Sequence, residues 1–105
     1  MKRVKRHLPF LTSILREANG LKRHDLLKHA NADQINAVSE VVLNLLKNNI
    51  PIPPSLMAKL RPHKKVLREV GRRKNSVKKR REWLMAQKWS GLFRGLHDVL
   101  CQCTR

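Results

Sequence analysis

Lysine and arginine dominate residues 59–88, which hold thirteen of them against only Glu69 and Glu82. A run of cations with so few acids repels itself unless it meets a polyanion. Cations that meet nucleic-acid phosphates release condensed counterions, so this binding weakens with salt and does not depend on sequence. A merely solvated charged face normally carries interspersed acids, so we favour nucleic-acid binding here. We expect phosphate contacts from Lys64, Lys65, Arg68, Arg72, Arg73, Lys74, Lys78, Lys79, Arg80 and Arg81.

A second group of side chains has a spacing that could bind a metal ion. It consists of His97, Cys101 and Cys103 as three possible ligands. On a helix, however, Cys101 and Cys103 point to different faces, and no fourth ligand follows at a usual spacing. We also find no nucleophile with a base and an orienting group, so we expect neither a metal, nor a cofactor, nor an enzyme.

The overall charge agrees with an anionic partner. The 105 residues carry a formal charge of +17, with a pI near 11.4, and are 41% hydrophobic, which argues for a folded chain. No apolar run is long enough to cross a bilayer, and the two cysteines favour a reducing compartment. KRVKR at 2–6 and RRKNSVKKRR at 72–81 are typical of nuclear-import patches, so we expect the chain in the nucleus.

Helical periodicity organises the first half of the chain. Apolar spacing predicts helices at about 9–19 and 21–29, with Gly20 as a left-handed stop, Leu26 and Leu27 inward and Arg23 outward. Asn31 followed by Gln34 predicts a capped start for the helix at the centre of the core. That helix would bury Ile35, Val38, Val42, Leu45 and Leu46 and end before the proline-rich connector at 50–54.

The basic stretch divides into two helical parts. Pro54 can begin the first part, Pro62 predicts a break near Arg61, and Gly71 ends it. After a basic loop, Ser76 can cap a final basic helix reaching 88, in which Val77, Leu84 and Met85 are the only strong apolar residues. We expect this last part to stay loose until a polyanion orders it.

An apolar helical stripe fills the last segment, WSGLFRGLHDVLCQC. It has two interpretations. The stripe could complete the core, which we favour for so short a chain, or it could lie in a membrane interface through Trp89, Leu92, Phe93 and Leu96.

The predicted fold is thus all-α, a small bundle of about five to six helices with a basic C-terminal helical arm. Residues 1–58 would form a hydrophobic helical layer, 59–88 the basic arm and 89–105 an amphipathic helix, in one compact domain.

Three segments resemble the short basic proteins of animal Maverick/Polinton elements and adintoviruses. They are HLPFLTSILREAN at 7–19, LLKHANADQINAVSEVVLNLLKNNIPIPP at 26–54 and LRPHKKVLREVGRRKNSVKKRREWLMAQK at 60–88. The resemblance implies a virion core or minor protein, comparable to those of adenoviruses, and carries over no catalytic residue. The tail departs from the family, which commonly ends in a Gly-rich, very hydrophobic segment.

We therefore expect a DNA-binding and condensing protein without sequence preference, in the host nucleus and in a virion. RNA remains open as the nucleic acid, as does oligomerisation. The alternatives are a membrane-active protein that acts on anionic lipid through 89–105, and a structural protein associated with capsid proteins.

Overall fold

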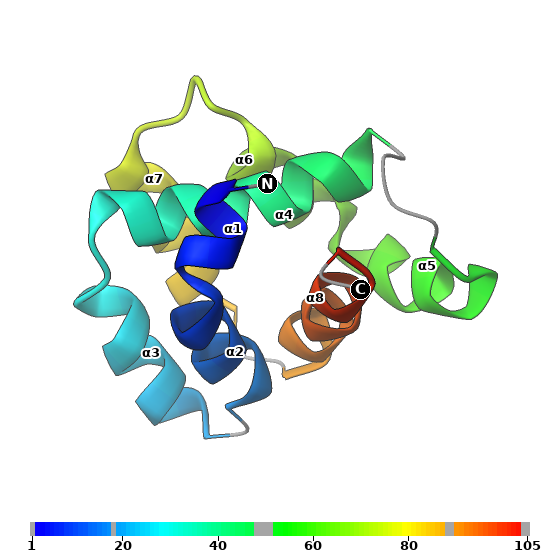
Figure 1. Cartoon of the computed structure of the whole chain (residues 1–105), viewed down its shortest axis with the longest axis horizontal. Coiled ribbons are helices and arrows are strands. Elements are labelled where there is room, and N and C mark those ends of the chain that lie inside the picture. The colour runs from blue at the N-terminus through cyan, green and yellow to red at the C-terminus, as the bar shows by residue number, and fades with distance from the viewer. Residues whose placement is uncertain (1, 18, 48–51, 88–89, 104–105) are drawn as a thin grey trace.

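Helix α4 (Ala32–Leu46) runs through the middle of the computed structural model, with other helices on either side of it (Figure 1). The structure describes residues 2–17, 19–47, 52–87 and 90–103. As predicted, the Asn31 side chain accepts a hydrogen bond from the Gln34 backbone, and the Gln34 side chain accepts one from the Asn31 backbone. This capping box satisfies amides that would otherwise lack partners at the start of the helix.

The described residues contain no strand, and the all-α prediction is confirmed. There are more helices than the five to six expected. In chain order they are α1 (Lys2–Arg6), α2 (Leu8–Arg16), α3 (Gly20–Lys28), α4, α5 (Pro54–Leu60), the 3-10 turn η1 (Arg61–His63), α6 (Lys64–Gly71), α7 (Val77–Met85) and α8 (Ser90–Cys103).

Helix α1 was not predicted as a helix, because KRVKR offers a single apolar residue. Val4 is nevertheless fully buried, and α1 packs along α4.

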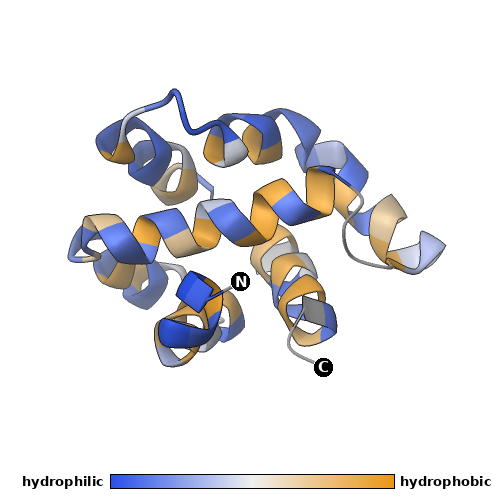
Figure 2. Ribbon diagram, turned by 45° about the horizontal axis from the view of Figure 1, so that its top comes forward, coloured by the Kyte–Doolittle hydropathy of each residue, from blue (hydrophilic) through white to orange (hydrophobic). Residues whose placement is uncertain are grey.

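A single hydrophobic core joins these helices. Helices α6 and α7 lie on one side of α4, and α2 and α8 lie on the other (Figures 1 and 2). Buried apolar residues from 1–58, 59–88 and 89–105 form one cluster, which includes Ile14, Val42, Val70, Leu84 and Phe93. No helix in the described part of the chain is both long and apolar enough to cross a membrane.

The turn at Asn19 and Gly20 differs from the sequence prediction. Gly20 does not adopt a left-handed conformation after α2 but is the first residue of α3. The Asn19 side-chain oxygen accepts hydrogen bonds from the amides of Leu21, at 2.9 Å, and Lys22, at 3.3 Å. Asn19 therefore caps the helix that follows, and α2 already ends at Arg16.

Helix α3 is rotated relative to the predicted orientation. Leu26 is 38% exposed, whereas Arg23, which was expected outward, is 2% exposed. The Arg23 guanidinium lies 4.1 Å from the centre of the Phe93 ring and donates a hydrogen bond to the Glu17 carbonyl at 2.8 Å. These contacts make Arg23 a link between α3 and α8.

Leu46 was also predicted to be buried and is 38% exposed.

The predicted boundaries in the second half are largely confirmed. Helix α5 begins at Pro54, η1 interrupts the helix at Pro62, α6 ends at Gly71, and the Ser76 side chain accepts a hydrogen bond from the Lys79 amide. Helix α7 ends at Met85 rather than at 88. Residues 48–51, which include the first two residues of the proline-rich connector, lie outside the described part of the chain.

The last helix belongs to the core. Leu92, Phe93 and Leu96 of α8 are no more than 1% exposed, and α8 packs against α2, α4 and α5. This burial confirms the favoured expectation that the stripe completes the core, and it does not fit the alternative that these three residues face a membrane. Trp89, the fourth residue of that set, lies outside the described residues.

Candidate nucleic-acid interface

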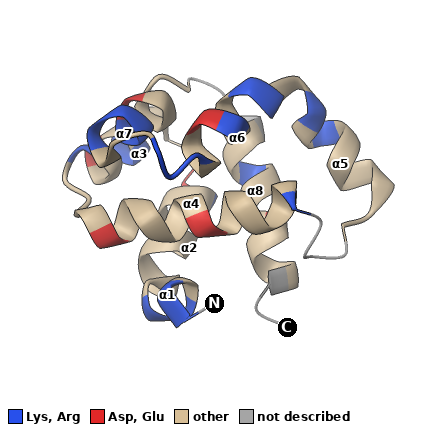
Figure 3. Ribbon diagram, turned by 90° about the horizontal axis from the view of Figure 1, so that it is seen from above, with Lys and Arg blue, Asp and Glu red and all other residues tan. Residues whose placement is uncertain are grey.

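Eight of the ten predicted phosphate-binding residues are exposed on α6, on α7 and on the loop between them. Figure 3 shows Lys and Arg positions running over these elements and on to η1 and α5. We call the eight the basic surface: Lys64, Lys65, Arg68, Arg72, Arg73, Lys74, Lys78 and Lys79.

The α6 cations are exposed because the opposite face of α6 packs on α4. Leu67, Val70 and Gly71 are buried there. A Cβ on Gly71 would lie 3.2 Å from Val42 Cγ1 and 3.3 Å from Leu46 Cδ1, so the two helices approach closely at this point. Lys64, Lys65 and Arg68 follow one another at helical spacing on the outward face. Packing thus holds these side chains on a fixed surface.

The loop between α6 and α7 is fastened by Asn75. Its side-chain amide donates to the Glu69 carbonyl oxygen at 2.8 Å and to the Glu69 carboxylate at 2.9 Å. The same carboxylate lies 4.0 Å from the Arg72 guanidinium. The acid of α6 is therefore engaged within the loop, and Arg73 and Lys74 project from it exposed.

Arg80 does not belong to the basic surface, contrary to the prediction. Its side chain is 4% exposed. Its guanidinium donates to the Ser39 hydroxyl of α4 at 2.7 Å and to the Asn75 carbonyl at 3.1 Å. Arg80 thus joins α7 to α4 and to the loop, and it is too deeply buried to contact phosphate.

The pKa of Arg80 reflects its burial first and then the charge around it. Burial lowers this pKa below its usual value, and the positive charges of Arg73 and Arg3 lower it further. No carboxylate in the described part of the chain makes an ion pair with Arg80. An uncompensated cation therefore lies beneath the basic surface and adds to its positive potential.

Arg81 is half-buried and has a structural partner. Its Nη2 donates to the Ala30 carbonyl, just beyond the end of α3, at 2.7 Å, while its Nε is buried without a hydrogen-bond partner. The outward face of α7 carries Lys78, Lys79 and Glu82 instead. Helix α7 is consequently packed against α3, α4 and α6, and the prediction of a loose basic arm was wrong.

The acids of α4 lie on the side that faces α1. The Asp33 carboxylate contacts Arg3 at 3.0 Å and Arg6 at 3.4 Å and is hydrogen-bonded to His7, while Glu40 lies 3.9 Å from Arg3. The hydrogen bond with His7 is the main cause that lowers the pKa of Asp33, and Arg3 lowers it further. Helix α1 therefore neutralises these acids, and they do not offset the charge of α6 and α7.

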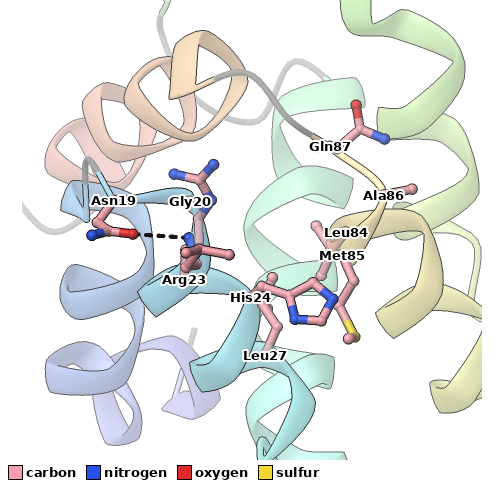
Figure 4. Close-up of a pocket in the computed structure, with 10 residues that line it drawn as sticks. Asn19, Gly20, Arg23, His24, Leu27, Leu84, Met85, Ala86 and Gln87 are labelled. Atoms are coloured by element: carbon pink, nitrogen blue, oxygen red, sulfur yellow. Dashed lines mark hydrogen bonds between the residues drawn. The ribbon is translucent and has the colours of Figure 1, made fainter.

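Other candidate sites carry less chemistry. No three His, Cys, Asp or Glu side chains gather as metal ligands within the described residues, and the Cys103 side chain of the suggested ligand set is outside them. A cavity of about 510 Å³ lies between α3 and α7, lined by Arg23, His24, Leu27, Leu84 and Met85 among others (Figure 4). Arg23 is occupied there by the Glu17 carbonyl and the Phe93 ring.

We found no match for the chain among protein-family models, curated proteins or solved structures.

Proposed function

We propose that the chain binds the phosphate backbone of DNA without sequence preference through the basic surface. The observation that carries the proposal is the gathering of eight exposed cations on α6, α7 and their loop, while Glu69 is held by Asn75 and the acids of α4 by α1. Contacts between cationic side chains and phosphates position a protein on DNA. They carry no sequence information, because they do not involve the base edges.

The binding surface is part of the fold and is not a disordered tail. Arg80 fastens α7 to α4 through Ser39, and α6 approaches α4 closely at Gly71. Binding then costs little backbone ordering, because the helices that carry the cations are already formed. Neutralisation of neighbouring phosphates lowers the repulsion between duplexes, and this is how the protein would condense DNA.

The biological setting of the proposal comes from the resemblance to Maverick/Polinton and adintovirus proteins. On the basis of this resemblance, the chain is a core or minor protein of a virus-like particle, present in the host nucleus and in the virion beside capsid proteins. The same surface would accept RNA phosphates, so the preference between DNA and RNA is a quantity to be measured.

The experiment compares the binding of unrelated duplexes, single strands and RNA over a range of salt concentrations. We expect unrelated duplexes to bind with similar affinity, which falls by orders of magnitude between low and moderate salt. An affinity that salt does not change would contradict the proposal, as would a strong preference for one duplex sequence.

A further inference from the structure

A second surface feature lies at the junction of α4, α5 and α6. It is a groove of about 270 Å³, which we call the Met57 groove, and its apolar lining includes Leu46, Met57, Leu60 and Leu67. Leu46 and Met57 come from different helices and are two of the four large apolar side chains that are exposed among the described residues. Two exposed apolar side chains that converge on one hollow indicate a binding surface more strongly than scattered ones do.

The rim of the Met57 groove is cationic. Arg61 of η1 and Lys64 of α6 line it, and no Asp or Glu among the described residues does. Neither cation forms an ion pair with a carboxylate that the structure describes. An apolar floor with unpaired cations beside it is complementary to an apolar side chain flanked by carboxylates.

We propose that the Met57 groove binds an acidic, amphipathic peptide segment of a partner protein, which inserts an apolar anchor between α5 and α6. The groove volume of about 270 Å³ is just below the about 300 to 1,000 Å³ of sites for drug-sized ligands, so it suits a single anchor side chain. A second copy of this chain fits less well, because each copy carries a formal charge of +17 and the groove rim is itself positive. The proposal does not depend on DNA binding.

The test must separate the groove from general attraction to a cationic protein. The probe is a short fluorescent helical peptide with Leu on one face and Glu on the other, and the comparison peptide has the same charge with Ser in place of each Leu. At moderate salt, which screens exposed charges, we expect the Leu peptide to bind the full chain about tenfold more tightly, the value of one buried apolar side chain.

Matched variants locate the site. Met57→Glu places a carboxylate in the groove and should abolish the advantage of the Leu peptide. Leu21→Glu makes the same charge change at an apolar residue of α3 that is 83% exposed, and it should preserve that advantage. Circular dichroism would verify that both variants keep the helical fold.

Three results would overturn the proposal. The first is equal binding of the Leu and Ser peptides, and the second is an equal loss in Leu21→Glu. The third is a concentration-dependent dimer, seen by sedimentation, that Met57→Glu abolishes, because the groove would then hold a second copy.

Discussion

Lys79 and Arg80 are neighbours in the sequence with opposite environments. Lys79 is exposed on the basic surface, and Arg80 is buried against Ser39 and Asn75. We expect Lys79→Ala to change the free energy of unfolding by less than about 0.5 kcal/mol. It should also reduce the salt slope of DNA binding, which is the slope of the logarithm of the binding constant against the logarithm of the salt concentration, by about 0.9. Arg80→Ala should instead lower the free energy of unfolding by about 2 kcal/mol or more, because it removes buried packing and two hydrogen bonds.

Urea unfolding and DNA titrations on both variants would measure these effects. If Arg80→Ala kept its stability and lost salt slope as Lys79→Ala does, the assignment of Arg80 to the interior would be wrong.

Asp33 should make stability depend on pH. The pKa of Asp33 is lowered in the folded chain, chiefly by the hydrogen bond with His7. The stabilisation is therefore fully present above the ordinary Asp pKa of about 3.9 and is lost as the pH falls through the lower pKa of the folded state. We expect Asp33→Asn to be less stable than the natural chain at neutral pH, and this difference should shrink below about pH 4.

Urea unfolding at several pH values would measure the difference. The control is Asp98→Asn, at an exposed carboxylate of α8, which should change stability little. A difference that stays constant into strong acid would show that the Asp33 carboxylate does not stabilise the fold.

At the scale of the elements, α8 meets α5 at Gly95. A Cβ on Gly95 would lie 2.6 Å from Leu60 Cδ2 and 3.3 Å from Leu60 Cγ, and Leu60 is buried. We expect Gly95→Val to lower the free energy of unfolding by about 1 to 3 kcal/mol through overpacking. At Gly20 the nearest atom, Arg23 Nη2, is 4.0 Å away, so Gly20→Val should have a smaller effect in the same urea unfolding assay. An equal loss in both would contradict the close contact of α8 with α5.

The sequence predicts elements well where one residue controls a local event. The Asn31 capping box, the start of α5 at Pro54, the interruption at Pro62 and the Ser76 cap all depend on local backbone chemistry. Asn19 shows the limit, because an Asn-Gly pair can end one helix or cap the next. Which occurs depends on the packing of α3, and periodicity does not encode that packing.

The looseness predicted for α7 was wrong for a related reason. Counting apolar residues gave Val77, Leu84 and Met85, too few to hold a helix. In the structure, Arg80 and Arg81 also fasten α7, through Ser39 and through the Ala30 carbonyl. Long cationic side chains can bury their stems and satisfy distant backbone groups. Their partners are about 40 or more residues away in the chain, so no local pattern shows them.

The whole molecule separates its charges. The sequence places the cations at 59–88 but does not tell which are exposed, and it does not show that α1 engages the acids of α4. The fold supplies both facts, by packing α6 and α7 against one side of α4 and α1 along another. The basic surface therefore consists of eight of the ten predicted residues, without Arg80 and Arg81.

The most direct test of this account is the salt slope of DNA binding in two matched double variants. Lys78→Gln with Lys79→Gln neutralises two cations of the basic surface, and Lys2→Gln with Lys5→Gln neutralises two exposed lysines of α1. With about 0.9 of log-log slope for each phosphate contact, the first variant should lose up to about 1.8 of slope, and the second should keep nearly all of it. Equal slopes in both variants, or a greater loss in the α1 variant, would contradict DNA binding through α6, α7 and their loop.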